Sequence, residues 1–424
     1  MQWSPRRGDL RTNGAQQMIL DKADVVVVGG GTVGISTAFF LASKGHDVVV
    51  AEAREVAFGA SGRNMGFLHM HNRAAGFQLE LARAGRALYD EFSELLGPSF
   101  EFQTNGAMTY FYTDEQRQVF KEFVDMRRGQ GVGMELLDAE QAREAAPILS
   151  PDVIGATFSP EDGQIRTPKF VRSLAQESIR RGVRIRENTP ALGLLKSRDA
   201  VKGVRTLYGD IPADRVVWCG GVWSTMLKAE GLDVPIRTER LGAIMMGEVE
   251  EQLDKILNGP LAVKQYSFYR DLPSYKDEYF TSPNEDSGHG IEHLEVVSKT
   301  ENGNLFIGCP MDYPDQLDDR MPLGGLKMAI DALLEQFPNY RSLGVEGTWT
   351  GLIPATADAM PILDEVDALP GLVLATGHVF GNLAGPITGK LVSELISGDE
   401  LSLPIDELAL DRPALANADD VIRW

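Results

Sequence analysis

Three glycines near the start of the chain, Gly29, Gly31 and Gly34, have the spacing of a loop that binds a dinucleotide. They follow an apolar run at Val25–Val28, a helical apolar pattern comes next, and a second apolar run ends on Glu52. In such a β-α-β unit the first glycine permits a tight turn, the second lets backbone N–H groups approach a pyrophosphate, and the third lets helix and strand pack closely. Glu52 would accept both ribose hydroxyls and repel a 2′-phosphate, which disfavours NADP and leaves FAD and NAD open. The expected contacts are Gly29, Gly31, Thr32, Val33, Gly34, Glu52 and Ala53.

The elements that must position these residues are spread along the whole chain. Apolar residues at helical spacing predict helices over Gln78–Leu95, Asp114–Arg128, Asp138–Ala146, Thr167–Arg181 and Gly325–Phe337. Alternating patterns predict strands within Phe100–Tyr112 and over Val183–Glu187, Ala191–Leu195, Val201–Leu207, Arg215–Cys219, Ala262–Tyr269 and Leu305–Cys309. The tail, Gly371–Ser397, predicts a strand, a glycine-rich turn and a helix. Because glycine-rich turns from strand to helix occur at both ends of the chain, we expect a nucleotide domain assembled from separated segments.

Composition limits the classes of protein that fit. With 424 residues, the chain can hold about two to three domains. A net charge of −20 argues against binding to nucleic acid or to an anionic membrane, because either partner requires a basic face. The two cysteines, Cys219 and Cys309, lie in apolar stretches and are expected to be small buried hydrophobes in a reducing compartment. No apolar run is as long as a membrane span, and Arg6–Arg7 is followed by polar residues, so we expect a cytoplasmic protein without an export signal.

Five further motifs point to a known family. They are GASGRNMG at Gly59–Gly66, SPEDGQIRTPKF at Ser159–Phe170, VVWCGGVWS at Val216–Ser224, WTGLIPATADAMPIL at Trp349–Leu363 and ATGHVFGNLAGPITGK at Ala375–Lys390. With the β-α-β opening, they make the chain resemble the D-amino-acid oxidase-type flavoproteins, the group of glycine oxidase, sarcosine oxidase and gamma-glutamylputrescine oxidase. The resemblance runs from about Ala23 to Ser397, and it implies FAD as the cofactor.

The resemblance also implies the architecture. It predicts an α/β (α+β) fold, with a Rossmann-like FAD-binding domain and a second domain whose mixed or antiparallel sheet covers the flavin and binds the substrate. The FAD-binding domain is expected to be discontinuous, from residues 21–95, 151–235 and 346–424. The substrate-binding domain would take residues 96–150 and 236–345. Residues 1–20 are expected to form a flexible N-terminal extension.

The second glycine-rich loop is expected to wrap the flavin. By resemblance, Ser61, Arg63 and Asn64 face the FAD phosphates, the ribityl chain or the ring edge, and Gly66 lies beside the isoalloxazine. An arginine would add a fixed cation to a doubly charged pyrophosphate. The other expected FAD contacts are Met65, Gly220, Gly221, Trp223, Gly351, Gly381, Asn382 and Leu383. FAD is expected to be non-covalent, because Arg63 stands where some relatives attach flavin through a histidine, and Trp349–Leu352 contains no cysteine.

Six residues are candidates for the substrate pocket. The resemblance aligns His69 with an arginine that helps to bind a substrate carboxylate, and it places Phe306 where relatives carry a lysine that promotes reaction with oxygen. Ile353 and Phe380 replace two carboxylate-binding arginines of relatives. Tyr266 and Arg270 belong to an expected aromatic strand that ends in a cation. We therefore expect modest oxygen reactivity and poor oxidation of glycine, alanine and sarcosine. An apolar amine, or a larger amino acid that reaches His69 or Arg270, should be a better substrate.

The resulting functional prediction is an FAD-dependent oxidoreductase. It would oxidise the C–N bond of a primary or secondary amine or an amino-acid derivative by hydride transfer to flavin N5, and the imine would then hydrolyse. The electron acceptor would be O2, a quinone or a redox partner. Alternatives are a flavin-dependent 2-hydroxy acid dehydrogenase, a flavoprotein subunit of a hetero-oligomeric amine or opine dehydrogenase, and a non-catalytic NAD-binding module. His289 and His293 are four residues apart, but no third ligand is evident, so no metal site is predicted.

Overall fold

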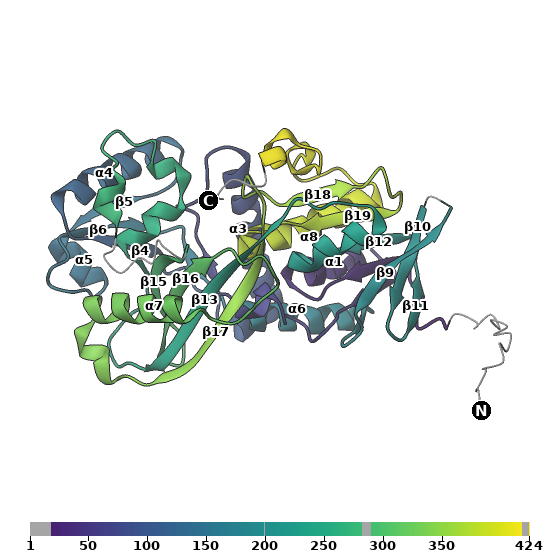
Figure 1. The fold of residues 1–424 in the computed structure, drawn as a ribbon, viewed down its shortest axis with the longest axis horizontal. Helices are drawn as coiled ribbons and strands as arrows, with labels where there is room; N and C mark the ends of the chain where they lie inside the picture. Colours follow the sequence, from purple (N-terminus) through teal and green to yellow (C-terminus); the bar gives the residue numbers. More distant parts are fainter. Residues whose placement is uncertain (1–17, 199, 282–289, 418–423) are drawn as a thin grey trace, which may run out of the picture.

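The computed structural model describes residues 18–198, 200–281, 290–417 and 424. Its strands form a six-stranded, an eight-stranded, a three-stranded and a two-stranded sheet. Figure 1 shows the eight-stranded sheet on the left and the six-stranded sheet on the right, each with its own helices. The predicted α/β (α+β) fold with two different sheets is therefore confirmed.

The six-stranded sheet is parallel except for one edge strand. Its central strand is valine at all four positions. Val25 and Val27 pack against helices on one face, whereas Val26 and Val28 pack against the three-stranded sheet on the other. A strand that is buried on both faces needs a continuous apolar run, which explains why Val25–Val28 shows no alternation. In sheet order the strands are β18 (Ile362–Glu365), β19 (Leu372–Thr376), β12 (Arg215–Trp218), β1 (Val25–Val28), β2 (Val48–Ala51) and β8 (Arg184–Arg186).

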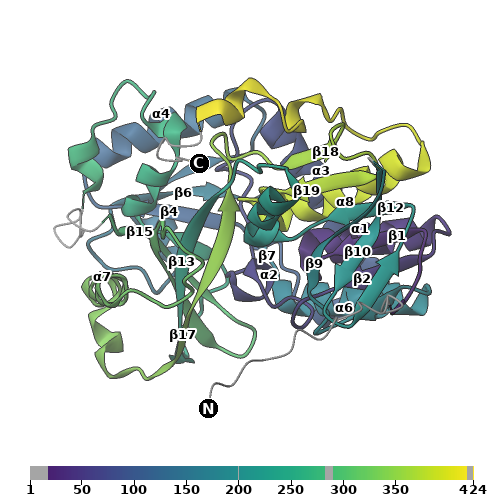
Figure 2. The same ribbon diagram turned by 45° about the vertical axis from the view of Figure 1, so that its right-hand side comes forward.

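The helical face of this sheet brings together the two ends of the chain. Its helices are α1 (Thr32–Ser43), α3 (Phe77–Leu96), α6 (Thr167–Arg180) and α8 (Gly381–Ser397). A Cβ atom built on Gly385 would lie 2.9 Å from Thr32 Cγ2, and one on Gly389 would lie 2.6 Å from Ser36 Cβ. These two glycines thus let α8 cross α1 at close range, and Figure 2 shows the two helices side by side.

The opposite face of the sheet is covered by three antiparallel strands, β9 (Ala191–Ser197), β10 (Ala200–Thr206) and β11 (Gly209–Pro212). Ile19 forms a bridge to Asp210 of β11, so residues 18–20 lie against this sheet rather than in a free extension. Residues 1–17 of the expected extension lie outside the described residues.

The eight-stranded sheet has two differently covered faces. Leu305 and Ile307 pack with helix α7 (Leu323–Gln336), whereas Phe306 and Ala243 face the core that is shared with the helices of the first sheet. In sheet order the strands are β17 (Val345–Ala355), β13 (Arg237–Glu248), β16 (Asn304–Asp312), β15 (Glu292–Lys299), β14 (Ile256–Asn258), β4 (Ala107–Phe111), β6 (Gly155–Ser159) and β5 (Glu135–Asp138). The other helices of this half are α4 (Asp114–Gly129) and α5 (Ala139–Ala145).

Shorter elements connect these sheets. They are α2 (Ala60–Arg63), β3 (Phe67–Leu68), β7 (Gly163–Gln164) and the 3-10 helices η1 (Gly97–Phe100), η2 (Gly221–Glu230), η3 (Pro260–Gln265), η4 (Ser267–Tyr269), η5 (Asp277–Phe280), η6 (Pro338–Ser342), η7 (Asp406–Leu408) and η8 (Pro413–Asn417). β3 pairs with β7 in the two-stranded sheet, which joins the second glycine-rich loop to the segment before α6.

One predicted strand differs from the observed fold. The strand predicted over Ala262–Tyr269 is wrong, because these residues form η3 and η4. Their aromatic pattern reflects packing instead, since Tyr269 stacks on Phe123 of α4 with ring centroids 4.3 Å apart.

The domain boundaries stay a prediction. β6 and β17 pair within the eight-stranded sheet, although residues 155–159 and 346–355 were expected in the FAD-binding segments.

Candidate functional site

The N-terminus of α1 forms the first part of the site. Gly29 has a φ of +105°, and a Cβ built on Gly34 would lie 2.0 Å from the Gly29 carbonyl oxygen, so both glycines are required by the local backbone. Ser61 Oγ accepts a hydrogen bond of 2.9 Å from the Thr32 backbone N–H. A Cβ on Gly31 would lie 3.0 Å from the same hydroxyl oxygen. The backbone N–H of Thr32 at the helix N-terminus thus points at an oxygen acceptor. The N–H groups at a helix N-terminus are also the donors that bind a pyrophosphate.

Glu52 follows β2, next to this turn. Its Oε2 accepts a hydrogen bond of 2.5 Å from the Gly30 backbone N–H, and its Oε1 accepts one of 2.7 Å from Arg54 N. Each carboxylate oxygen can accept a second hydrogen bond. Burial raises the pKa of Glu52 from its ordinary value, although the backbone donors at Arg54 and Gly30 oppose the shift. The carboxylate is therefore fixed at the carboxyl end of the strand with capacity left for ribose hydroxyls.

Three segments far apart in sequence meet at Asn64. Its Oδ1 accepts hydrogen bonds from Gly66 N (2.8 Å), Thr167 Oγ1 (2.8 Å) and Asn382 Nδ2 (3.1 Å). The Tyr89 hydroxyl donates to the Asn382 carbonyl oxygen at 2.6 Å. The predicted residues Asn64, Gly66 and Asn382 thus lie together. Sequence reasoning missed Thr167, the first residue of α6, and Tyr89, although SPEDGQIRTPKF contains Thr167.

Arg63 is engaged in contacts with the protein itself. Its guanidinium forms an ion pair of 2.7 Å with Asp319 and lies 4.8 Å from the ring centroid of Phe58. Its carbonyl oxygen accepts a hydrogen bond of 3.0 Å from Trp349 Nε1. A role on the pyrophosphate would require the Asp319 ion pair to open.

The other predicted contacts follow strand ends around the same loops. Gly220 and Gly221 come directly after β12, the neighbour of β1. A Cβ on Gly59 would lie 3.4 Å from the Trp223 ring, and one on Gly351 would lie 3.5 Å from Arg63 Cβ. Trp223 and Gly351 thus border the loop Gly59–Gly66, whereas Gly220 lies beside Gly29, at the first glycine-rich turn.

A buried polar and aromatic cluster lies beyond this loop. His69 stacks on Phe67 with ring centroids 5.0 Å apart, and burial lowers the pKa of His69 to about 3, so the ring is neutral. Arg73, which sequence reasoning did not single out, donates from Nε to the His69 carbonyl oxygen at 2.9 Å. Its guanidinium carbon lies 3.1 Å from the ring centroid of Phe380. Tyr266 is buried beside Arg73, and burial raises the pKa of Tyr266 to about 12.

The remaining pocket candidates are distributed over the eight-stranded sheet and its edge. Phe306 is buried, its ring centroid lies 5.3 Å from that of Trp349, and the Arg166 guanidinium lies 5.2 Å from its centre. Arg270 is exposed, unlike the buried Tyr266, so the structure does not bring it into the cluster. The cation expected at the end of the aromatic segment therefore points away from the other candidates.

Ile353 lies opposite Glu239 in the antiparallel pair of β17 and β13. Residues directly opposite one another in such a pair present their side chains on the same face. Glu239 is fully buried, its Oε1 accepts a hydrogen bond of 3.1 Å from the Tyr313 hydroxyl, and burial raises the pKa of Glu239 to about 8. A buried acid, mostly protonated at neutral pH, thus stands next to the position where relatives are expected to carry an arginine.

Comparison with known proteins identifies the family and separates an FAD enzyme from an NAD-binding module. The family model described as FAD dependent oxidoreductase matches residues 24–395. The chain belongs to this family. The family assignment confirms the predictions of FAD as cofactor and of an FAD-dependent oxidoreductase, and it excludes the non-catalytic NAD-binding module.

Relatives with known names are distant but cover nearly the whole chain. Glycine oxidase from Bacillus licheniformis is 25% identical over 387 residues, which is 89% of this chain and 93% of that protein. Sarcosine oxidase subunit beta from Arthrobacter sp is 27% identical over 393 residues, 89% of this chain and 87% of that protein. The crystal structure of glycine oxidase from Geobacillus kaustophilus superposes with a TM-score of 0.79 at 24% identity and covers 92% of this chain and 99% of that chain. This similarity supports the fold.

The hydrogen-bonding groups described above fit an FAD molecule. The α1 N-terminus and Ser61 would bind the pyrophosphate, and Glu52 would accept hydrogen bonds from the adenosine ribose. The hydrogen bonds around Asn64 would hold the second glycine-rich loop against the ribityl chain or the ring edge. Both cysteines are buried and free, and burial raises the pKa of each thiol to about 12, so neither is a ready nucleophile for flavin attachment. Within the described residues, no helix is both long and apolar enough to cross a membrane.

Non-covalent binding gives the first testable prediction. Precipitation of the FAD-loaded protein with trichloroacetic acid should release all of the flavin into the supernatant, because neither Arg63 nor the free thiols can hold it covalently. Absorbance of the supernatant at the flavin maximum measures the release. Yellow colour that remains in the washed, denatured pellet would contradict the prediction.

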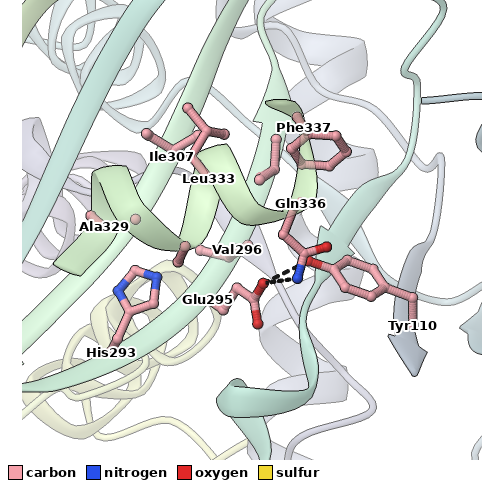
Figure 3. A pocket seen from close by; sticks show the side chains of 12 residues that line it. Tyr110, His293, Glu295, Val296, Ile307, Ala329, Leu333, Gln336 and Phe337 are labelled. Carbon is pink, nitrogen blue, oxygen red and sulfur yellow. Dashed lines mark hydrogen bonds between the residues drawn. The ribbon is translucent and has the colours of Figure 1, made fainter. Parts of the chain in front are cut away.

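A separate small cavity lies under α7, on the face of the eight-stranded sheet that carries Ile307 rather than Phe306 (Figure 3). Glu295 accepts hydrogen bonds from the Tyr110 hydroxyl (2.8 Å) and Gln336 Nε2 (2.6 Å), and burial raises the pKa of Glu295 to about 7. His293 also lines this cavity, whereas His289 lies outside the described residues. Because the sheet separates this cavity from Phe306 and Trp349, we assign it no part in the FAD site.

Proposed function

We propose that the protein oxidises the C–N bond of a primary or secondary amine or of an amino-acid derivative. The bound FAD supplies the redox chemistry, as the acceptor of a hydride from the carbon next to nitrogen. The names of the relatives, glycine oxidase and sarcosine oxidase subunit beta, support an amine as the substrate. O2, a quinone or a redox partner would reoxidise the protein.

The observation that carries this proposal is the buried polar and aromatic cluster that follows the flavin loops. Phe67 and His69 follow Gly66 directly, and Phe380 precedes the helix that carries Asn382. A substrate bound beside a neutral His69, a largely protonated Glu239 and aromatic rings finds no carboxylate that would stabilise an ammonium ion, so these surroundings favour the neutral amine, the form that can release a hydride. The chain's own residues thus need to orient the substrate, exclude water and keep the nitrogen unprotonated.

Anaerobic bleaching of the flavin by a panel of compounds tests the proposal. Amines, N-alkyl amino acids and amino acids of both hands are mixed with the FAD-loaded protein in an anaerobic cuvette, and the flavin absorbance is followed. We expect bleaching by at least one amine, with one equivalent of ammonia or alkylamine released per flavin reduced. Bleaching by 2-hydroxy acids without release of nitrogen would instead support oxidation of a C–O bond.

The name sarcosine oxidase subunit beta keeps a second candidate open, in which this chain works with a partner subunit that carries electrons away. Under that alternative, the flavin would be bleached by substrate but reoxidised slowly by air. A stable partner would also co-purify from the native host. Fast turnover of the isolated chain with O2 would reject this alternative.

A further inference from the structure

Arg73 is a buried cation without a counter-charge. Its exposed fraction is 3%, and Nη1 has no hydrogen-bond partner among the described residues. Burial lowers the pKa of Arg73 to about 10, so the guanidinium is still charged at neutral pH. Burying an unpaired charge costs several kcal/mol, which makes an unsatisfied buried arginine a marker of a missing ligand.

The acid that acts electrostatically on Arg73 is already committed elsewhere. Asp162 accepts hydrogen bonds from Met70 N (2.9 Å), His71 N (3.2 Å) and Ser159 Oγ (2.8 Å), and it forms a short contact with His71 Nδ1. Burial opposes ionisation of Asp162, but the interaction with His71 lowers its pKa to about 2. No carboxylate in the described part of the chain forms an ion pair with Arg73. The described residues therefore supply no anion that pairs with Arg73.

The surroundings of Arg73 form an aromatic wall. The guanidinium carbon lies 3.1 Å from the ring centroid of Phe380, and the Trp424 ring lies 5.7 Å from Phe380 and 5.8 Å from Tyr266. An arginine stacked on an aromatic face presents the N–H groups at its edge to a planar anion. In Arg73, Nε is used by the His69 carbonyl oxygen and the side chain is also hydrogen-bonded to Tyr266, so Nη1 is the nitrogen without a partner among the described residues. Phe380 is also the position at which the sequence shows an arginine of relatives to be missing. Arg73 places a cation directly over that residue, from a segment about three hundred residues earlier in the chain.

We propose that Arg73 binds the carboxylate of the substrate, so that the substrate is an amine that also carries a carboxylate. This rests on the proposed amine oxidation. A carboxylate can accept two parallel hydrogen bonds from a guanidinium, and such a pair is strongest where water is excluded. The apolar part of the substrate would lie against Phe380, Tyr266 and Trp424. The expectation that the pocket lacks a carboxylate-binding cation, which came from Ile353 and Phe380 alone, does not take Arg73 into account.

Binding of a ligand that cannot be oxidised tests the role of Arg73 separately from catalysis. Benzoate and the isosteric neutral benzamide are titrated into the FAD-loaded protein, and the change in the visible flavin spectrum gives each dissociation constant. We expect benzoate to bind at least 10-fold more tightly than benzamide. Arg73→Met should weaken benzoate at least 10-fold and leave benzamide within 2-fold. Arg73→Lys keeps the charge without the planar fork, so we expect an intermediate benzoate affinity with FAD retained.

Arg270→Met is the matched control, because Arg270 is exposed and only four residues from Tyr266. Its benzoate affinity should equal that of the unmodified protein. Unchanged benzoate affinity in an FAD-loaded Arg73 variant, or equal binding of benzoate and benzamide to the unmodified protein, would overturn the proposal. Weaker FAD binding with unchanged benzoate selectivity in FAD-saturated Arg73→Lys would also overturn it, since Arg73 would then serve the flavin. If no amine bleaches the flavin while benzoate binding depends on Arg73, the anion site stands and the proposed amine oxidation falls.

Discussion

Replacing Gly34 by alanine is expected to weaken FAD binding more than about 100-fold, or to prevent folding of the nucleotide domain. The added Cβ would lie 2.0 Å from the Gly29 carbonyl oxygen and 3.3 Å from Val27 Cγ1. Both neighbours belong to the β1 segment, so relief of the clash must move α1 away from the sheet. A loss of about 3 kcal/mol corresponds to this factor and lies at the upper end of the cost of overpacking. Fluorescence quenching of FAD on titration with apoprotein measures the dissociation constant.

Gly129→Ala provides the control for this prediction. Gly129 is the last residue of α4, and an added Cβ there would meet no atom within 4 Å. Its dissociation constant for FAD should match that of the unmodified protein. An FAD affinity for Gly34→Ala within a few-fold of the unmodified value would show that the contact between α1 and β1 tolerates a methyl group, contrary to the geometry.

Glu239→Gln is expected to stabilise the protein at alkaline pH and to have little effect in mild acid. Burial raises the pKa of Glu239 to about 8, so the folded state keeps a proton that the unfolded chain loses near the ordinary carboxyl pKa. The folded state therefore loses stability as pH rises from that ordinary value to about 8. Between pH 5.5 and 8.5 the free energy of unfolding falls by about 3 kcal/mol through Glu239. The glutamine variant does not lose this stability, because glutamine does not titrate.

Urea unfolding of both proteins at pH 5.5 and 8.5, with saturating FAD, measures this difference. The stability of the variant relative to the unmodified protein should rise between the two values. Glu135→Gln, at an exposed position of β5, should show no such rise. A difference that is the same at both pH values would mean that Glu239 is ionised in the folded state. Because Ile353 faces Glu239 across β13 and β17, an arginine introduced at 353 would pair with this acid, so we do not expect Ile353→Arg to improve the oxidation of small amino acids.

Local patterns in the sequence were sufficient for the nucleotide-binding core. The spacing of Gly29, Gly31 and Gly34 and the runs on either side define β1, α1 and β2 as observed, because each of these contacts joins residues close in sequence. The helices α3, α4, α5, α6 and α7 also lie where the helical patterns predicted them. Asn64, Gly66 and Asn382 were predicted as separate motifs, and the structure joins them through shared hydrogen bonds.

The residues expected around the substrate could not be predicted from local patterns, because their contacts join distant segments of the chain. Arg73 is a candidate because it lies over Phe380, and Glu239 is a candidate because it lies opposite Ile353. The two residues of each pair are far apart in the sequence, so no local spacing predicts their contact. The strand prediction for Ala262–Tyr269 was wrong for a related reason. The alternating aromatics of this segment suit a strand, but their partners lie on α4, and this tertiary contact overrides the local pattern.

The close crossing of α1 and α8 through Gly385 and Gly389 sets a constraint on biosynthesis. α1 emerges from the ribosome early, yet the helix that covers it and the strand β19 beside β12 are made last. β1 can pair with β2 as soon as residue 51 has been made, but the face of α1 that packs on α8 must wait for its partner. At about 5–20 residues per second, that wait lasts tens of seconds. The close crossing therefore forms only when the last fifty residues are synthesised, and until then this face of α1 stays uncovered.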